Sequence, residues 1–164
     1  MREGYRYLVT LEDRIGRHRQ QPEESNAMLC LPTALLLHTT EQGCHYDWLM
    51  GDPTDPKGRL WTARVNHPAE LWPTLGSLNL TVLPAHRRHY LTYQGPVAPR
   101  RGQVRRVDQG WHTPLRWTGR DILTAVCFEH TRMTLHLTAQ SRNRWRAIVL
   151  ESPRSYNKTD FFAR

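Results

Sequence analysis

The alternation of apolar and polar positions in residues 28–152 predicts short β-strands. Leu78, Leu80 and Val82 are apolar and are separated by polar side chains. A period of two residues is typical of a strand with one buried face. Residues 121–151 repeat this pattern in three stretches separated by turn-forming residues, so we expect a three-stranded meander there.

A continuous apolar run over residues 31–37 predicts a buried strand that leads directly into His38. A polar turn follows, and the next stretch carries His45 and Asp47. Side chains of a strand alternate between its two faces, so His45 and Asp47 should point to the same side. A hairpin would then bring His38 back beside them.

Glycine and proline divide the remaining pattern. Residues 51–58, GDPTDPKG, predict a turn-rich loop, and residues 108–110 predict a tight turn. Helical character is confined to residues 68–75, where Pro73 interrupts it. Many short strands with such punctuation are typical of a mainly β fold, either a barrel or a sandwich.

The two ends of the chain differ from the rest. Residues 16–26 are charged and almost free of apolar side chains, which predicts a linker or poorly ordered segment within an N-terminal extension of residues 1–27. The alternative for residues 5–11, which are richer in apolar side chains, is a short strand or helix that docks on the main domain. Residues 153–164 are predicted to be a loop-like C-terminal tail. Residues 28–152 remain as one β-domain, which fits a total length of 164 residues.

The formal net charge is +8, and arginine supplies far more of the positive charge than lysine. The planar guanidinium fork suits phosphate oxygens, so the charge favours nucleic-acid binding, with solubility alone as the equally weighted alternative. The three cysteines are odd in number and scattered, which fits a reducing cytoplasm. No apolar stretch is long enough to span a bilayer. We expect a cytoplasmic monomer without membrane contact.

His38, His45 and Asp47 are candidate metal ligands. Two imidazoles and one carboxylate suit a divalent cation such as zinc, manganese or iron. The chain has nine histidines, so a His-x-Asp pair near another histidine also arises by chance. Ordinary hydrogen-bonded histidines in a metal-free β-domain are therefore the alternative.

A second group of candidate residues follows in residues 83–106. His86, His89 and Tyr90 lie close together in the sequence, and a histidine, a tyrosine hydroxyl and neighbouring guanidiniums can form an anion pocket. The alternative is a solvated basic loop with an aromatic side chain packed beneath it. If Val104 faces inward on a strand, Arg106 should face inward with it. The arginines of this region are Arg87, Arg88, Arg100, Arg101, Arg105 and Arg106.

HYDWL at residues 45–49 and LPAHRRHYLTYQGPVAPRRGQVRRVDQG at residues 83–110 resemble the 3′-phosphoesterase module of bacterial DNA ligase D, in particular its stand-alone relatives. The resemblance extends from about Leu31 to about Val149. Its landmarks, H…HYD, then HxxxY and a later WD-like turn at Val107–Asp108, follow the family's order. The resemblance implies a small antiparallel β-barrel with short helical segments and a site in a basic cavity.

The resemblance also implies roles for individual residues. His38, His45 and Asp47 would hold a catalytic divalent metal, usually manganese in this family, with zinc as the alternative. His86 and Tyr90 would contact the scissile phosphate. The implied activity removes a 3′-ribonucleotide or 3′-phosphate from DNA or RNA ends, so that a polymerase or ligase can use the hydroxyl. Residues expected to bind phosphate or nucleic acid are Arg88, Arg100, Arg101, Arg105 and Arg106.

The chain departs from the family pattern at several positions. The turn between His38 and His45 is one residue longer, which a bulge could absorb. Leu36 stands where glutamine is common, and Gln94 where glutamate precedes the glycine. The family's N-terminal functional residues have no match in residues 1–26.

The largest departure is Leu49, where catalytic members of the family carry an arginine that reaches the phosphate. Arg64, Arg88 and Arg106 are candidates to replace it. Loss of this charge favours a second hypothesis, in which the protein is a catalytically impaired relative. Such a protein would bind nucleic-acid ends or a repair partner without turnover.

Overall fold

The computed structural model describes residues 28–152. The expected N-terminal extension, residues 1–27, and the expected tail, residues 153–164, lie outside the described residues. The short helical elements of the described part are η1 (Ala69–Leu71), α1 (Trp72–Leu75) and η2 (Arg88–Leu91). Its strands are β1 (Leu31–Thr40), β2 (Gly43–Asp52), β3 (Asp55–Val65), β4 (Ser77–His86), β5 (Gly95–Pro96), β6 (Gln103–Trp117), β7 (Asp121–Phe128), β8 (Arg132–Ala139) and β9 (Arg144–Glu151).

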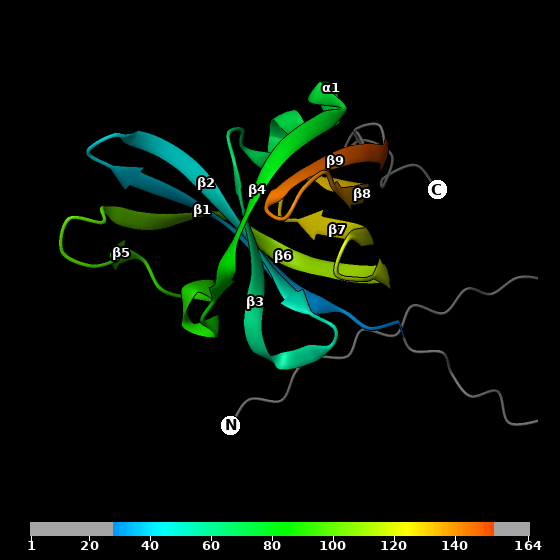
Figure 1. Ribbon diagram of the computed structural model, residues 1–164, viewed down its shortest axis with the longest axis horizontal. Coiled ribbons are helices and arrows are strands. Elements are labelled where there is room, and N and C mark those ends of the chain that lie inside the picture. The colour runs from blue at the N-terminus through cyan, green and yellow to red at the C-terminus, as the bar shows by residue number, and fades with distance from the viewer. Residues whose placement is uncertain (1–27, 153–164) are drawn as a thin grey trace, which may run out of the picture.

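The strands form one antiparallel sheet that closes on itself (Figure 1). Eight strands follow one another in the order β1-β2-β3-β4-β9-β8-β7-β6, and β1 pairs again with β6. This last pairing makes a barrel, and the short β5 adds to β6. Closure leaves few strand edges without hydrogen-bond partners. The predicted mainly β, antiparallel barrel with short helical segments is confirmed.

Alternate strand positions fill the interior of the barrel. In β8 the predicted period of two is confirmed, because Met133, Leu135 and Leu137 are buried while the side chains between them are partly exposed. The ring centroids of Trp48 in β2 and Trp72 in α1 lie 5.0 Å apart. The tryptophans that pack into this interior are Trp48, Trp61, Trp72, Trp117 and Trp145.

A second, smaller apolar cluster lies on the opposite face of β1, β2 and β3. Leu36, Leu49 and Leu60 are fully buried there, although their neighbours along each strand face the barrel interior. Tyr90 and Leu91 of η2 pack over this cluster and cover it. Strands buried on both faces are apolar at consecutive positions, which explains the continuous run of residues 31–37.

Two predicted turns differ from the structure. The loop predicted over residues 51–58 is only the turn between Asp52 and Asp55, because both strands extend into it. The tight turn predicted at residues 108–110 is wrong, since these residues lie within β6. The β1–β6 register shifts there, which makes a β-bulge, and the Asp108 carboxylate accepts hydrogen bonds from two backbone amides. An aspartate that bonds backbone amides produces the same sequence signal in a bulge as in a turn.

The helical segment predicted at residues 68–75 is present as η1 followed by α1. Pro73 was expected to interrupt it, but Pro73 lies in the first turn of α1, where a missing N–H costs nothing. The Trp72 indole donates a hydrogen bond of 2.9 Å to the His67 carbonyl and is fully buried. This short element therefore contributes a large side chain to the core.

No helix within residues 28–152 has the length and apolar character needed to cross a membrane. The thiols of Cys30, Cys44 and Cys127 are all free. Cohesion of the described domain therefore depends on packing and backbone pairing.

His112 is buried in the barrel wall with both ring nitrogens engaged. Its Nε2 lies 2.9 Å from the Gly51 carbonyl oxygen and its Nδ1 lies 2.9 Å from Thr124 Oγ1. A carbonyl only accepts, so Nε2 carries the proton of the neutral ring. Burial lowers the pKa of His112 from 6.5 to about 4, with the Gly51 hydrogen bond opposing the shift.

The stability of the domain should therefore fall in mild acid. Below pH 6.5 the unfolded chain binds a proton at His112 that the folded chain does not, so stability decreases until about pH 4, where both states are protonated. The full effect is about 3 kcal/mol, at about 1.4 kcal/mol per pKa unit. Urea unfolding of wild type and His112→Gln at pH 7.5 and 4.5 measures it. An unchanged pH dependence in the variant would contradict the assignment.

Candidate metal centre

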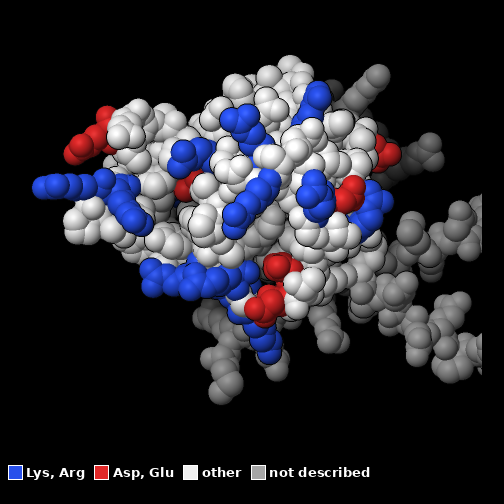
Figure 2. Space-filling view, in the orientation of Figure 1, with Lys and Arg blue, Asp and Glu red and all other residues white. Residues whose placement is uncertain are grey.

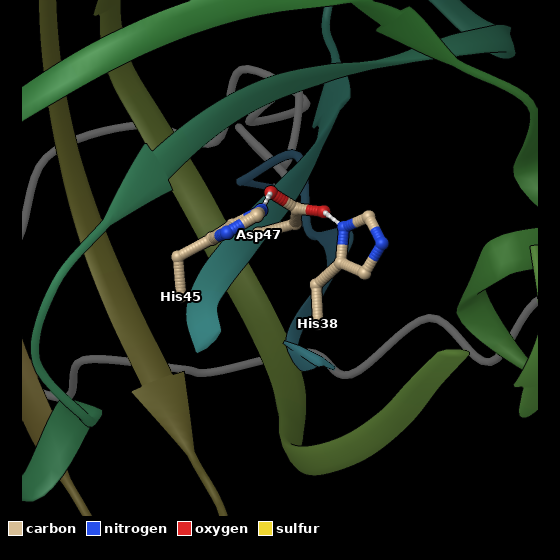
Figure 3. Close-up of side chains that lie close together, drawn as sticks. All are labelled: His38, His45 and Asp47. Carbon is tan, nitrogen blue, oxygen red and sulfur yellow. Dashed lines mark hydrogen bonds and ion pairs between the residues drawn. The ribbon is translucent and has the colours of Figure 1, made fainter. Parts of the chain in front are cut away.

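His38, His45 and Asp47 converge on one face of the β1–β2 hairpin (Figure 3). His38 and His45 are direct Cα partners across the two strands, and Asp47 lies two residues further along β2. His38 Nδ1 lies 3.2 Å from Asp47 Oδ2, and His45 Nε2 lies 3.4 Å from Asp47 Oδ1. The convergence predicted from the hairpin is confirmed. The longer turn needs no bulge, because the β1–β2 register is continuous as far as Thr40 and Gly43.

Two candidate ligand atoms of this group are buried without a hydrogen-bond partner. His45 Nε2 and Asp47 Oδ1 face each other, and neither makes a hydrogen bond. The Asp47 side chain is only 4% exposed, so water compensates little of its charge. Buried polar atoms are nearly always satisfied, and an isolated buried carboxylate costs several kcal/mol. A cation between the two atoms would satisfy both.

The orientation of His38 supports the same conclusion. Its Nε2 lies 2.7 Å from the Arg101 carbonyl oxygen, which can only accept, so Nε2 carries the proton. In a neutral ring Nδ1 then presents a lone pair toward the Asp47 carboxylate. Two electron-rich atoms this close repel each other unless the ring is protonated or a cation lies between them. Metal-binding histidines typically have their other N–H held by a carbonyl in this way.

The spacing of the donors suits a divalent ion. All three ligand atoms lie within 4.8 Å of one another. A metal about 2.1 Å from each ligand places neighbouring ligands about 3.0 to 3.4 Å apart in octahedral or tetrahedral geometry. His38 Nδ1 lies 3.2 Å from Asp47 Oδ2 and His45 Nε2 lies 3.4 Å from Asp47 Oδ1, so each imidazole is at this spacing from a different oxygen of the carboxylate. Three protein ligands also leave coordination positions open, as in catalytic rather than structural metal sites.

The surroundings keep His45 in its neutral, metal-binding form. Burial lowers the pKa of His45; Asp47 opposes this shift, whereas Arg64 and His38 add to it. Arg64 is the Cα partner of Asp47 on β3, so both side chains belong to the same face. Since only the neutral imidazole binds metal, a lowered pKa favours binding at neutral pH.

Leu49 shares the face of His45 and Asp47, as expected, but it is fully buried in the second apolar cluster. Among the three candidates for the missing charge, Arg64 is exposed directly beside Asp47. The other two make structural contacts. Arg88 donates to the Pro56 carbonyl and Arg106 donates to the Leu91 carbonyl.

His86 and Tyr90 lie together, with ring centroids 5.5 Å apart. His86 Nδ1 lies 2.9 Å from the Pro84 carbonyl, so Nδ1 carries the proton and Nε2 remains available. The Cα partner of His86 is Leu60, four residues from Arg64 along β3, or about 13 Å at the usual rise. The pair therefore lies on the same face as the metal-binding candidates, beyond the apolar cluster.

The arginines predicted in residues 100–106 are divided between faces. Arg106 lies on the face of Val104, as predicted, and is partly buried. Arg105 is exposed on the opposite face, away from His38, the partner of Val104. Arg100 and Arg101 are exposed in the turn before β6.

Gly102 holds this turn against β1. Its φ is 77°, and a Cβ there would lie 2.0 Å from the Thr39 carbonyl oxygen. Glycine tolerates both the positive φ and the close approach. The turn thereby presents the Arg101 carbonyl to His38. The contact between the Arg101 carbonyl and His38 was not predicted from the sequence. The only sequence feature that indicates it is the glycine at position 102.

A scan against protein-family models gave no match to this chain. A search of curated proteins also gave none. The function is therefore inferred from the barrel, from the convergence of His38, His45 and Asp47, and from the resemblance in residues 45–49 and 83–110.

Replacing Gly102 by alanine should weaken metal binding without touching a ligand. The added methyl group displaces the turn, so the Arg101 carbonyl no longer orients His38. Loss of such an outer partner typically lowers metal affinity by about 10- to 100-fold. Titration calorimetry with Mn²⁺ measures the change. Gly119→Ala is the matched control, because its Cβ meets open space, and equal affinities in both variants would contradict the role of the turn.

Proposed function

We propose that this protein is a metal-dependent phosphoesterase that acts on 3′ ends of nucleic acid in DNA repair. The observation that carries the proposal is the buried pair of unsatisfied donor atoms, His45 Nε2 and Asp47 Oδ1, beside His38. The resemblance to the 3′-phosphoesterase module of DNA ligase D supplies the reaction, removal of a 3′-ribonucleotide or 3′-phosphate. Manganese is the proposed ion, with zinc as the alternative, since two imidazoles and a carboxylate suit both.

A divalent ion held by His38, His45 and Asp47 would polarise a phosphoryl oxygen and lower the pKa of a bound water. The other roles belong to side chains of the chain itself. Arg64 lies beside Asp47 and neutralises the negative charge of the phosphate. The uncharged Leu49 has no such role. His86 lies beyond the apolar cluster, about 13 Å along the sheet from Arg64, so it reaches the terminal nucleotide rather than the phosphate at the metal ligands. Tyr90 contacts the same nucleotide from the cluster on which it packs.

The apolar cluster between these groups shapes the site. Leu36 and Leu49 lie two residues from His38 and Asp47 on the same face. Tyr90 packs against the far side of this cluster. We infer that the terminal nucleotide lies over the apolar cluster, with its phosphate toward the metal ligands.

A second candidate function is binding of nucleic-acid ends without turnover. The burial of Leu49 favours this second function. A charged side chain at this position would lie inside the apolar cluster, so position 49 supplies no charge to bind the phosphate. Purified protein with Mn²⁺ and 3′-phosphate or 3′-ribonucleotide oligonucleotides separates the two functions. Tight binding that weakens with salt, and no product, would support the second. A ligase or polymerase would be the natural partner in either case, as the user of the repaired end.

Substitution of His45 by alanine should abolish metal-dependent release of a 3′-ribonucleotide from a primer–template. It should also remove Mn²⁺ binding, since one of three ligands is lost. Product analysis by electrophoresis and calorimetry with Mn²⁺ measure the two effects. His130→Ala changes an exposed histidine in the β7–β8 turn and serves as the control. Activity of His45→Ala equal to that of the control would refute the metal site.

Arg64→Gln should lower kcat while Mn²⁺ still binds. Loss of one charge-stabilising donor costs about 10²- to 10³-fold in a dry site, so we expect about 10- to 100-fold at this exposed position. Arg64→Lys keeps the charge and should recover part of the rate. Steady-state kinetics on a 3′-phosphate oligonucleotide measure both variants. A wild-type kcat in Arg64→Gln would show that this guanidinium does not face the phosphate.

A further inference from the structure

A groove of about 410 Å³ begins beside the metal-binding candidates and crosses β3, β4 and β9. Asp47 pairs with Arg64, Arg64 with Thr81, and Thr81 with Arg144. Paired residues project from the same face, so these side chains form a row that starts at the metal site. The polar side chains that line the groove are Arg64, Asn66, Asn79, Thr81, Gln140 and Arg144.

The lining has the chemistry of a phosphodiester backbone site. Beside the apolar side chains of Leu80 and Trp145 it contains two guanidiniums, three amides and a hydroxyl, and no acidic residue. Within residues 28–152, the guanidiniums of Arg64 and Arg144 make no hydrogen bond or ion pair with protein groups, so both can take a ligand. Figure 2 shows basic side chains distributed over the face that carries β4 and β9. Arginine, asparagine and threonine are common phosphate and sugar ligands.

We propose that this groove holds the sugar–phosphate backbone of the strand whose 3′ end lies at the metal site. The proposal rests on the proposed function and adds the direction in which the substrate runs. Arg64 and Arg144 are two strands apart, or about 10 Å. Arg144 therefore binds an internal phosphate of the strand whose terminal phosphate lies near Arg64.

This path differs from the one that the basic stretch of residues 100–106 suggests. Arg105 projects from the face opposite to His38, and Arg106 is bonded to the Leu91 carbonyl. A nucleic-acid strand that runs across β3, β4 and β9 instead contacts the guanidiniums of Arg64 and Arg144, which lie on the same face as the metal-binding candidates. Contacts to the backbone alone would hold single strands with little sequence preference.

The length dependence of binding tests the proposal. Fluorescein-labelled oligothymidylates of two and six nucleotides with 3′-phosphates are bound in EDTA, which prevents turnover, and anisotropy is followed over a salt series. Wild type should bind the longer probe more tightly. Arg144→Gln should lose roughly fivefold in affinity for the longer probe, and its log–log salt slope should decrease by about 0.7, the value of one phosphate contact on a single strand.

Two further variants complete the experiment. Arg120→Gln removes the same charge at an exposed turn outside the groove and should bind like wild type. Arg105→Gln tests the competing path. The proposal is overturned if Arg144→Gln keeps the wild-type salt slope, or if Arg105→Gln alone loses the advantage of the longer probe.

Turnover is measured separately with Mn²⁺ and the six-nucleotide probe. If the wild-type protein cleaves the probe and Arg144→Gln binds it normally, backbone binding in the groove is refuted and the phosphoesterase function is retained. If the wild-type protein binds the longer probe more tightly through Arg144 but forms no product, backbone binding in the groove is supported and catalysis is refuted. The two failures are therefore distinguishable.

Discussion

The carboxylate of Asp47 is the group around which the site is organised. It is almost fully buried, contacts two imidazoles and leaves one oxygen without a hydrogen bond. A buried charge without compensation costs several kcal/mol, so the fold retains it only where a cation or protonated partner balances it. The hairpin register, the Arg101 carbonyl and the lowered pKa of His45 all leave lone pairs directed at this point. Together they support the proposal of a metal site over a pair of ordinary histidines.

Burial on both faces of β1 and β2 accounts for the apolar side chain at Leu49. One face of these strands fills the barrel, and the other lies beneath Tyr90 and Leu91. An arginine at this position would enter an apolar cluster, whereas Arg64 on the neighbouring strand is exposed beside Asp47. The same face of a sheet can thus carry the charge on a different strand. Function at such a site depends on position in the sheet rather than on spacing in the sequence.

The predictions that succeeded concern local pairing. The period of two identified the strands from residues 121–151, and a short polar turn between two apolar stretches was sufficient to bring His38 opposite His45. Those that failed concern residues 51–58 and 108–110, where turn-forming residues lie within or beside paired strands. Asp108 satisfies backbone amides at a bulge. The chemistry of a bulge and that of a turn are alike, so composition cannot separate them.

The sequence by itself determined the hairpin and the metal-binding candidates, because neighbouring segments pair through short connections and alternate side chains share a face. Only the tertiary structure decided which groups surround them. The β1–β6 pairing that closes the barrel brings Gly102 and the Arg101 carbonyl, just before β6, to His38. The row from Arg64 to Arg144 likewise depends on the registers of the β3–β4 and β4–β9 pairs. Such long-range registers arise from packing of the whole barrel, for which a local pattern contains no information.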